Sequence, residues 1–370
     1  MSGGYGWGGR DRDQDFGGSK SSRDSGFSRA YTPYTSPQAP DAFSKANAQN
    51  SRVVSMSIGV GGKMASVAIP VPNNIDLTAR KHLVATKKNV IILNLDRTGS
   101  MGDWRDEIMA RLPVLFKEAG KYLGESIEIV FTGFGDLEFG DTFNVAPSGC
   151  GPELDGYLVA LSKHENGGGN GVESSEMPAV YALNNIDLSA ARNVFYFTVT
   201  DEGFYPQVKD SHVDALMGLR STEPNAAKVF QALKVKAHVF TVLAQTNTVN
   251  HRIQKQWEDA VGAENVVELD DARRVVDVLL GVMSKMQGLY DQFSVDLNGR
   301  QSPTQYGQVN IQTVHQACSK VIGAPAAPSV IAGTQSLMMG APQGSFGGVV
   351  AKSPLDDSDT TGGTRSLLTK

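Results

Sequence analysis

The central part of the chain alternates between short apolar runs and segments with helical periodicity. NVIILNL, residues 89–95, is a continuous apolar run, which is typical of a strand covered on both faces. After it, apolar residues recur at helical spacing at Trp104, Ile108, Leu112, Leu115, Phe116, Ala119 and Leu123. Pro113 lies inside this segment and should kink or interrupt the helix.

The same alternation continues to about residue 295. SIEIVFTGF, NVFYFTVTD, AHVFTVLAQ and NVVEL predict strands, whereas EMPAVYALNNI, EPNAAKVFQALKV and the long DARRVVDVLLGVMSKMQGLYDQF predict helices. Strands and helices that alternate in this way predict an α/β fold with a doubly wound, mostly parallel sheet flanked by helices and right-handed crossovers.

Segments of different character flank this pattern. RVVSMSIGVGGKMASVAIPVP predicts two strands joined at Gly61-Gly62, because two glycines supply the backbone conformation of a tight hairpin turn. Segments rich in Gly, Ser and other small or polar residues cannot bury enough apolar surface to offset their ordering entropy. The predicted organisation is a disordered Gly/Ser/Arg-rich tail at 1–45, a hairpin extension at 46–84, the α/β domain at 85–297, and a flexible tail at 298–370 with one short helix in VNIQTVHQACSKVIG.

Composition narrows the classes of function. The chain of 370 residues has a formal net charge of −5, so no global basic field recruits nucleic acid. No apolar run approaches the roughly 20 residues that span a bilayer, and the N-terminus has no apolar signal core. The two cysteines, Cys150 and Cys318, form no disulfide framework. We therefore expect a cytoplasmic protein.

Polar side chains follow the predicted strands at points where ligands bind in such folds. Asp96 closes the first strand within DRTGSMG, which also places Thr98 and Ser100 at alternate positions, and Asp201 closes the third strand. The carboxyl ends of parallel strands share one edge of the sheet. Asn170, in the loop HENGGGNGVESSEMP, should open on the same edge. Oxygen ligands without His or Cys suit Mg²⁺, with Mn²⁺ and Ca²⁺ as alternatives.

These residues resemble the metal-ion-dependent adhesion site (MIDAS) of the von Willebrand factor type A (vWA) domain. DRTGSMG is similar to that family's Asp-x-Thr-Gly-Ser-Met motif, and VTDEGFYP is similar to its third loop. FGDLEFGD and GGGNGVESSEMP resemble the subgroup associated with alpha-kinases, although no kinase domain follows. The resemblance covers about residues 86–295. It implies metal ligands at Asp96, Thr98, Ser100, Asn170 and Asp201, and a protein partner whose acidic residue completes the coordination.

Several alternatives stay open at this point. Glu173 could replace Asn170 as the ligand from the second loop. DRTGS also resembles the phosphorylation loop of P-type ATPases, so that Asp96 could be a phosphoryl acceptor; no Gly-Asp-Gly-x-x-x-Asp loop follows, although Lys209 and Asp210 are available. A structural protein with a vestigial metal site is the third alternative. The binding module is preferred over an enzyme. The acids Asp136, Glu138 and Asp141 are expected to form a solvated loop.

Overall fold

The computed structural model describes residues 51–60, 63–72, 74–221, 223–301 and 305–324, and for the strands at 51–72 it describes only the backbone. The predicted N-terminal tail at 1–45 lies outside the described residues, as does the predicted C-terminal tail from residue 325 onward.

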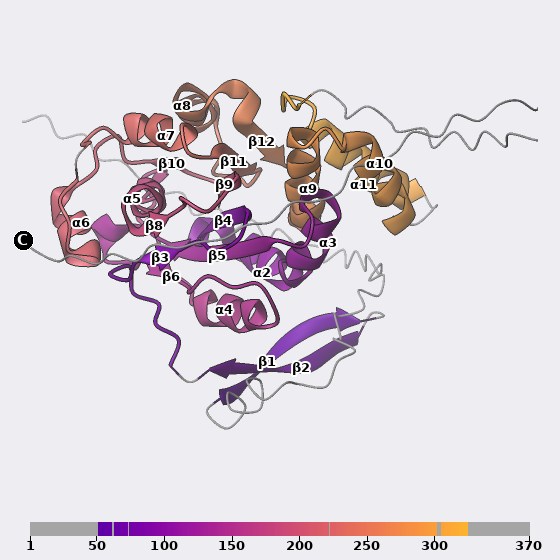
Figure 1. Cartoon of the computed structure of the whole chain (residues 1–370), viewed down its shortest axis with the longest axis horizontal. Helices are drawn as coiled ribbons and strands as arrows, with labels where there is room; N and C mark the ends of the chain where they lie inside the picture. The colour runs from indigo at the N-terminus through magenta and orange to yellow at the C-terminus, as the bar shows by residue number, and fades with distance from the viewer. Residues whose placement is uncertain (1–50, 61–62, 73, 222, 302–304, 325–370) are drawn as a thin grey trace, which may run out of the picture. The chain divides into compact units, whose positions relative to one another are not determined.

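A six-stranded sheet forms the centre of the described domain (Figure 1). The spatial order is β6-β5-β4-β9-β11-β12, and every pair is parallel except the short edge pair of β5 and β6. In chain order this is 3-2-1-4-5-6, so the sheet is doubly wound as predicted. The strands are β4 (Asn89–Asp96), β5 (Ile127–Phe134), β6 (Asn144–Val145), β9 (Asn193–Thr200), β11 (His238–Ala244) and β12 (Val266–Leu269).

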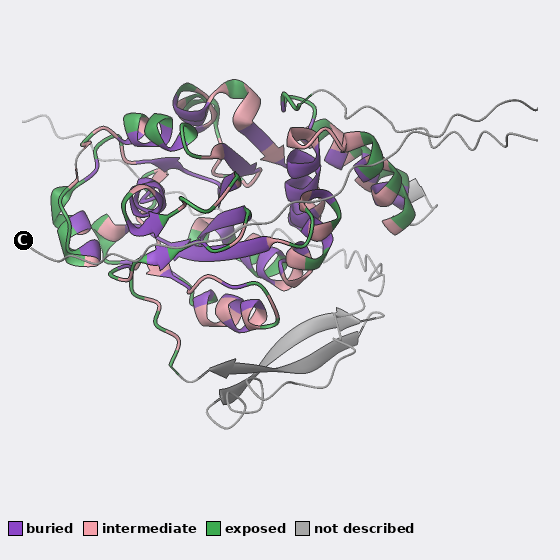
Figure 2. Ribbon diagram, in the orientation of Figure 1, coloured by how far each residue is buried: buried purple, intermediate pink, exposed green. Residues whose placement is uncertain are grey.

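Helices cover both faces of the sheet, and the strands are correspondingly buried along their length (Figure 2). Successive side chains of a strand point to opposite faces. Accordingly, Ile91, Leu93 and Leu95 belong to one core cluster, whereas Val90 and Ile92 belong to the other. The helices of the first cluster are α2 (Gly102–Arg111), α3 (Pro113–Leu123), α4 (Glu153–Leu161), α9 (Val275–Met286), α10 (Tyr290–Arg300) and α11 (Gln305–Ala317). Those of the second are α5 (Glu176–Asn185), α6 (Asp210–Met217), α7 (Ala226–Lys234) and α8 (His251–Val261).

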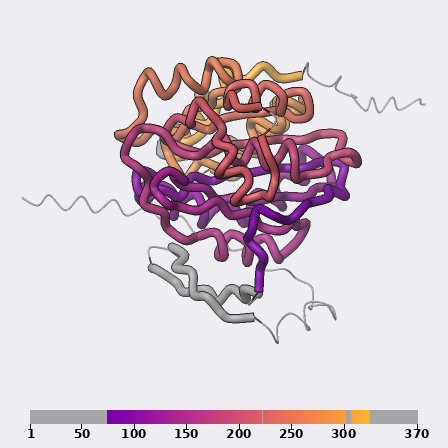
Figure 3. Tube along the Cα trace, turned by 90° about the vertical axis from the view of Figure 1, so that its left-hand side faces the viewer, coloured from indigo at the N-terminus to yellow at the C-terminus, as the bar shows by residue number. Residues whose placement is uncertain are grey.

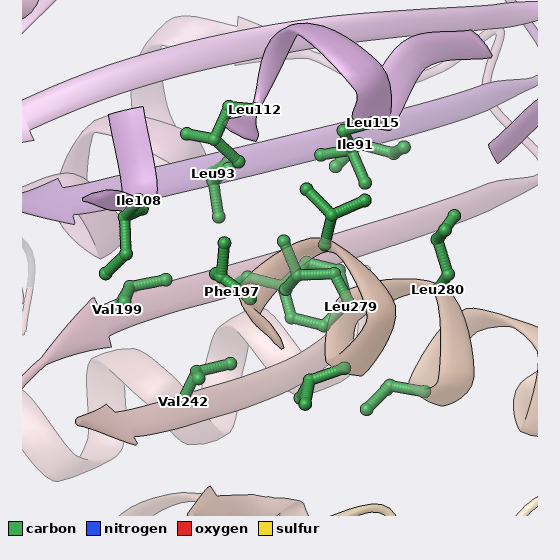
Figure 4. Packing of buried hydrophobic residues seen from close by; sticks show 14 of the residues in the cluster. Ile91, Leu93, Ile108, Leu112, Leu115, Phe197, Val199, Val242, Leu279 and Leu280 are labelled. Atoms are coloured by element: carbon green, nitrogen blue, oxygen red, sulfur yellow. The ribbon is translucent and has the colours of Figure 1, made fainter. Parts of the chain in front are cut away.

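The first core shows how the helices are held on the sheet (Figure 4). Leu93 of β4 and Phe197 of β9 lie among Leu112, Leu115 and the α9 residue Leu279. All five side chains are buried almost completely. Because a fully buried side chain of this size contributes roughly 1.5–3 kcal/mol by leaving water, this packing fixes the strands and therefore the loops at their carboxyl ends.

The prediction for Pro113 is confirmed, because α2 ends at Arg111 and α3 begins at Pro113. Proline lacks an amide hydrogen and is tolerated in the first turn of a helix. The predicted single closing helix is wrong. It divides into α9 and α10, and between them Gly288 has a φ of 68°, a left-handed conformation that glycine adopts without strain.

The predicted flexible tail also begins too early. The predicted short helix is present as α11, and Ile311, Val314, Cys318 and Val321 are buried in the first core cluster. The helices α9 to α11 lie together, as the neighbouring orange and yellow segments of Figures 1 and 3 show. Residues 298–301 and 305–324 therefore belong to the packed domain, because their apolar side chains complete its core.

Short strand pairs accompany the main sheet. The predicted hairpin is present as β1 (Ser51–Val60) and β2 (Lys63–Pro72), which pair antiparallel over their whole length. Two parallel pairs join distant segments: β3 (Leu83–Val84) with β8 (Ile186–Asp187), and β7 (Val172–Glu173) with β10 (Gly203–Phe204). The second pair places Glu173 beside the loop that follows β9.

Candidate functional site: a carboxylate and hydroxyl cluster at the switch point of the sheet

The strand order reverses between β4 and β9, which are direct neighbours in the sheet. Chain connections leave these two strands in opposite directions, and in open α/β sheets the crevice beyond their carboxyl ends is where ligands bind. Asp96 is the last residue of β4, and Asp201 follows the last residue of β9. The two predicted acids therefore lie together at the switch point.

Four predicted side chains form a continuous chain of contacts at this point. The Thr98 hydroxyl lies 2.6 Å from Oδ1 of Asp96, and the Thr98 amide donates to the same oxygen over 2.9 Å. The hydroxyl oxygens of Thr98 and Ser100 are 3.0 Å apart. Ser100 Oγ donates to Oδ1 of Asp201 over 3.0 Å. The alternating spacing of DRTGS thus brings both hydroxyls between the two carboxylates, as the sequence predicts.

The chain of contacts from Asp96 to Asp201 has one proton too few when both carboxylates are ionised. It contains three oxygen–oxygen contacts, but only the two hydroxyls carry a proton, and each hydroxyl has one. If Thr98 donates to Asp96 and Ser100 donates to Asp201, the lone pairs of the two hydroxyl oxygens face each other. A cation beside these oxygens would supply the missing positive charge.

The outer oxygen of each aspartate is held by a threonine that sequence analysis did not identify. Thr200 donates to Oδ2 of Asp96 over 2.6 Å, and Thr246 donates to Oδ2 of Asp201 over 2.6 Å. Thr200 precedes Asp201 directly, and Thr246 follows β11 at the same sheet edge. The signal that could have identified both is a hydroxyl residue at or just beyond the carboxyl end of a neighbouring parallel strand.

Burial makes negative charge costly at this site. Asp96, Thr98 and Asp201 are each at most 1% exposed. Burial, together with the neighbouring Asp201 carboxylate, raises the pKa of Asp96 to about 6, and burial also raises the pKa of Asp201. Among the described residues, no Lys or Arg forms an ion pair with either aspartate.

Two further carboxylates lie close to the aspartates. Glu173 and Glu202 are almost fully buried, and the Oε2 atom of each has no hydrogen-bond partner among the described residues. A methyl group added at Gly167 would lie 2.9 Å from Oε1 of Glu173 and 3.2 Å from Cβ of Thr98, so the Glu173 carboxylate lies near Thr98. Burial and the Asp96 charge raise the pKa of Glu173 to about 10, and burial and Asp201 raise that of Glu202 to about 7.

The structure does not bring Asn170 into the chain of contacts. Its side chain is exposed; Oδ1 accepts from the amide of Val172 over 3.1 Å, and Nδ2 donates to the Tyr205 hydroxyl over 2.9 Å. Glu173, from the same loop, lies close enough to Asp96 for the Asp96 charge to raise the pKa of Glu173. A role for Asn170 as a metal ligand therefore stays a prediction. The side-chain oxygen of Asn170 already accepts a hydrogen bond from the Val172 amide.

Of the three acids expected to form a solvated loop, Glu138 is exposed, whereas Asp136 and Asp141 are buried. Asp136 accepts a hydrogen bond of 2.9 Å from Tyr205. Asp141 accepts from the amides of Asn166 and Gly167 over 3.1 Å and 2.8 Å. Asp141 thus fixes the backbone of the Gly-rich loop, which is a structural role that composition alone did not reveal.

Arg97 points away from the chain of contacts. Its guanidinium is buried against Glu165 at 3.2 Å and also donates to Thr142 and Asn144. The arginine side chain occupies the space over Gly133, where an added methyl group would lie 2.6 Å from Nε. Lys209, considered for the phosphoryl-transfer alternative, pairs with Glu138 instead.

No protein-family model matches the chain, and no curated protein matches it. Solved structures include chains that are similar in fold. The pilus adhesin SpaC from Lactobacillus rhamnosus GG, in its open conformation, is 14% identical with a TM-score of 0.40; the match covers 55% of this chain and only 31% of the adhesin. The vWF domain of the type V pili tip protein Mfa5 from Porphyromonas gingivalis is 10% identical with a TM-score of 0.35, covering 59% of this chain and 98% of that one.

An aerotolerance-related membrane protein from Bacteroides fragilis is 11% identical with a TM-score of 0.34, and the match covers 53% of this chain and 99% of that one. The fold class itself rests on the strand order and crossovers described above. No helix in the described part of the chain is long and apolar enough to cross a membrane.

The side chains at the switch point are oxygen donors of two kinds, carboxylates and hydroxyls. Within the described residues, no three His, Cys, Asp or Glu side chains are arranged to hold a metal ion. The contact chain has only two carboxylates and completes its set of four oxygens with two hydroxyls. Oxygen-only donors of this kind fit a hard cation such as Mg²⁺, Mn²⁺ or Ca²⁺.

Proposed function

We propose that this chain is a metal-dependent protein-binding module. A single divalent cation, Mg²⁺ or alternatively Mn²⁺ or Ca²⁺, would be held by Asp96, Thr98, Ser100 and Asp201. The observation that carries the proposal is the proton count of the contact chain: two hydroxyl protons serve three oxygen–oxygen contacts, so that one contact is a repulsion between lone pairs when both carboxylates are ionised. A cation at these oxygens relieves that repulsion and offsets the charge of two buried carboxylates.

The bound cation would supply an open coordination position to which a partner can attach. Mg²⁺ takes about six oxygen ligands and usually keeps waters or a partner's oxygen among them. Four donors from the chain leave such positions free, and an acidic side chain of a partner protein is the ligand that the resemblance to the vWA family implies. The buried aspartates and their supporting threonines are rigid on this chain's side, so that binding requires little reordering.

Binding is proposed in preference to phosphoryl transfer. A phosphoaspartate enzyme needs a cationic group beside the phosphoryl oxygens. Arg97 is engaged with Glu165 and Lys209 with Glu138, and neither forms an ion pair with Asp96. The third alternative, a vestigial site, predicts that metal has no effect on the protein. A titration of the chain with metal distinguishes this alternative from the proposal.

Calorimetric titration of the chelator-treated chain with Mg²⁺ tests the proposal. We expect saturable binding of one ion per chain, lost in Asp201→Asn and retained in Asp136→Asn, whose carboxylate contacts Tyr205 rather than the chain of contacts. Absence of binding by the unchanged protein to Mg²⁺, Mn²⁺ and Ca²⁺ would overturn the proposal. Turnover of ATP that is abolished by Asp96→Asn would instead restore the enzyme alternative.

A further inference from the structure

The loop between β11 and α8 opens beside Asp201. β11 lies next to β9 in parallel register, with Leu243 opposite Thr200, so residues just after β11 reach the same sheet edge as Asp201. Thr246 lies in this loop and donates to Oδ2 of Asp201 over 2.6 Å. Neither the predicted ligands nor the motifs that carry the family resemblance include this loop.

The Thr246 hydroxyl is fixed from both sides. Its proton goes to Asp201, while its oxygen accepts from the amide of Thr248 over 3.2 Å. The loop is itself tied to the sheet, because the amide of Gln245 donates to the carbonyl of Leu269 in β12 over 3.0 Å. The hydroxyl is therefore held in one orientation by backbone groups that belong to a rigid part of the domain.

The same device recurs on the other aspartate. Thr200 donates to Oδ2 of Asp96 over 2.6 Å and accepts from the amide of Glu202, two residues further on, over 3.2 Å. In both cases a threonine occupies the outer oxygen of an aspartate, and in both cases an amide two residues later fixes that threonine. The inner oxygens, Oδ1 of each aspartate, are thereby directed toward the hydroxyls of Thr98 and Ser100.

We propose that the β11–α8 loop is a fourth loop of the cation site and that Thr246 is the residue that positions Asp201 for the cation. The inference rests on the proposed function. With Oδ2 held by Thr246, the carboxylate cannot rotate, and Oδ1 stays beside Ser100 where a cation would bind. Loss of the hydroxyl removes the 2.6 Å donor to Oδ2 and frees the carboxylate to turn.

The test measures the affinity of the full-length chain for Mg²⁺ by calorimetric titration, with Mn²⁺ and electron paramagnetic resonance as a second probe. Thr246→Val removes the hydroxyl and keeps the shape, and we expect Mg²⁺ binding to weaken roughly 10–100-fold, the usual effect of losing an outer partner of a metal ligand. Thr246→Ser keeps the hydroxyl, so its Mg²⁺ affinity should stay within about threefold of that of the unchanged chain. This is a smaller change than the loss of an outer partner causes.

Thr241→Val is the matched control. Thr241 is a buried threonine of β11, the strand that precedes the loop of Thr246, and the Thr241 hydroxyl has no hydrogen-bond partner among the described residues. The Thr241→Val variant should bind Mg²⁺ with the same affinity as the unchanged chain. Thermal unfolding without metal is recorded for every variant, so that a loss of affinity can be separated from a loss of folded protein.

The outcomes are distinct. Unchanged Mg²⁺ affinity in Thr246→Val, an equal loss in the Thr241→Val control, or failure of Thr246→Ser to retain affinity would each overturn the role of Thr246 while leaving the metal site in place. If the unchanged chain binds none of the three cations, the proposed function fails and the inference about the loop fails with it.

Discussion

Asp96→Asn should make the metal-free protein more stable and at the same time remove its response to metal. The carboxylate of Asp96 is fully buried, and its pKa rises from 3.8 to about 6 because of burial and the Asp201 charge. One pKa unit corresponds to about 1.4 kcal/mol, so keeping this group ionised near pH 7.5 costs on the order of 3 kcal/mol. The neutral amide removes this cost and can still accept from Thr98.

The expected sizes can be compared directly. A gain of about 3 kcal/mol in a domain of this size corresponds to a rise of roughly 6–12 °C in the melting temperature, at 2–4 °C per kcal/mol. Saturating Mg²⁺ at one hundred times its dissociation constant should stabilise the unchanged chain by about 2.7 kcal/mol. The unchanged chain with Mg²⁺ and the variant without it should therefore both melt well above the metal-free unchanged chain.

Differential scanning calorimetry at pH 7.5, with Mg²⁺ and with a chelator, measures all of these states. Asp155→Asn is a suitable control, because burial also raises the pKa of Asp155 to about 6 although that residue lies in α4, outside the contact chain. This control should keep the full response to Mg²⁺. A metal-free Asp96→Asn variant that melts below the unchanged chain would refute the reasoning, as would any stabilisation of that variant by Mg²⁺.

Three further outcomes are expected. Mg²⁺ affinity should fall as pH is lowered through about 6, because a proton then competes for Asp96; metal-free stability should change in the opposite sense, decreasing as pH rises from about 4 to 6, since only the folded state keeps that proton. Calorimetric titration and melting curves across this pH range check both signs. Asn170→Ala should leave Mg²⁺ affinity within about twofold, since its oxygen bonds the backbone, and a tenfold loss in a titration would make it a ligand. Val314→Ala in α11 should lower the free energy of unfolding by about 2 kcal/mol, whereas Val309→Ala on the exposed side of the same helix should cost less than about 0.5 kcal/mol; equal effects in urea denaturation would place α11 outside the core.

Sequence periodicity predicted the sheet well because the strands are buried on both faces. Such strands form continuous apolar runs in the sequence, and an aspartate marks the end of each run: β4 ends at Asp96, and β9 ends at Thr200, directly before Asp201. The end of the domain was predicted less well, because the segment that contains α11 is rich in Gln and its four core residues are separated by polar positions. Composition indicated a tail where a narrow apolar face completes the core.

The candidate site shows a similar division between local and distant information. Asp96, Thr98 and Ser100 come from one loop, so their spacing alone brings the hydroxyls together beside the first carboxylate. Thr200 and Thr246 act on carboxylates that belong to other strands, and which strands are neighbours is decided by the strand order. No pattern within a single loop contains that order.

The second loop also shows that the sequence of a single loop does not determine which of its residues lies at the site. Asn170 is the ligand that the family resemblance implies for the second loop, but the pairing of β7 with β10 brings Glu173, three residues further on, beside the loop of Asp201. Asn170 is left to bridge Tyr205 and the backbone. A loop can therefore keep the composition of a ligand-bearing segment while the short strand that ends it determines which of its oxygens faces the site. Metal titration of Asn170→Ala beside Glu173→Gln decides between the two residues, because only the one whose oxygen or charge acts on the cation should alter its affinity.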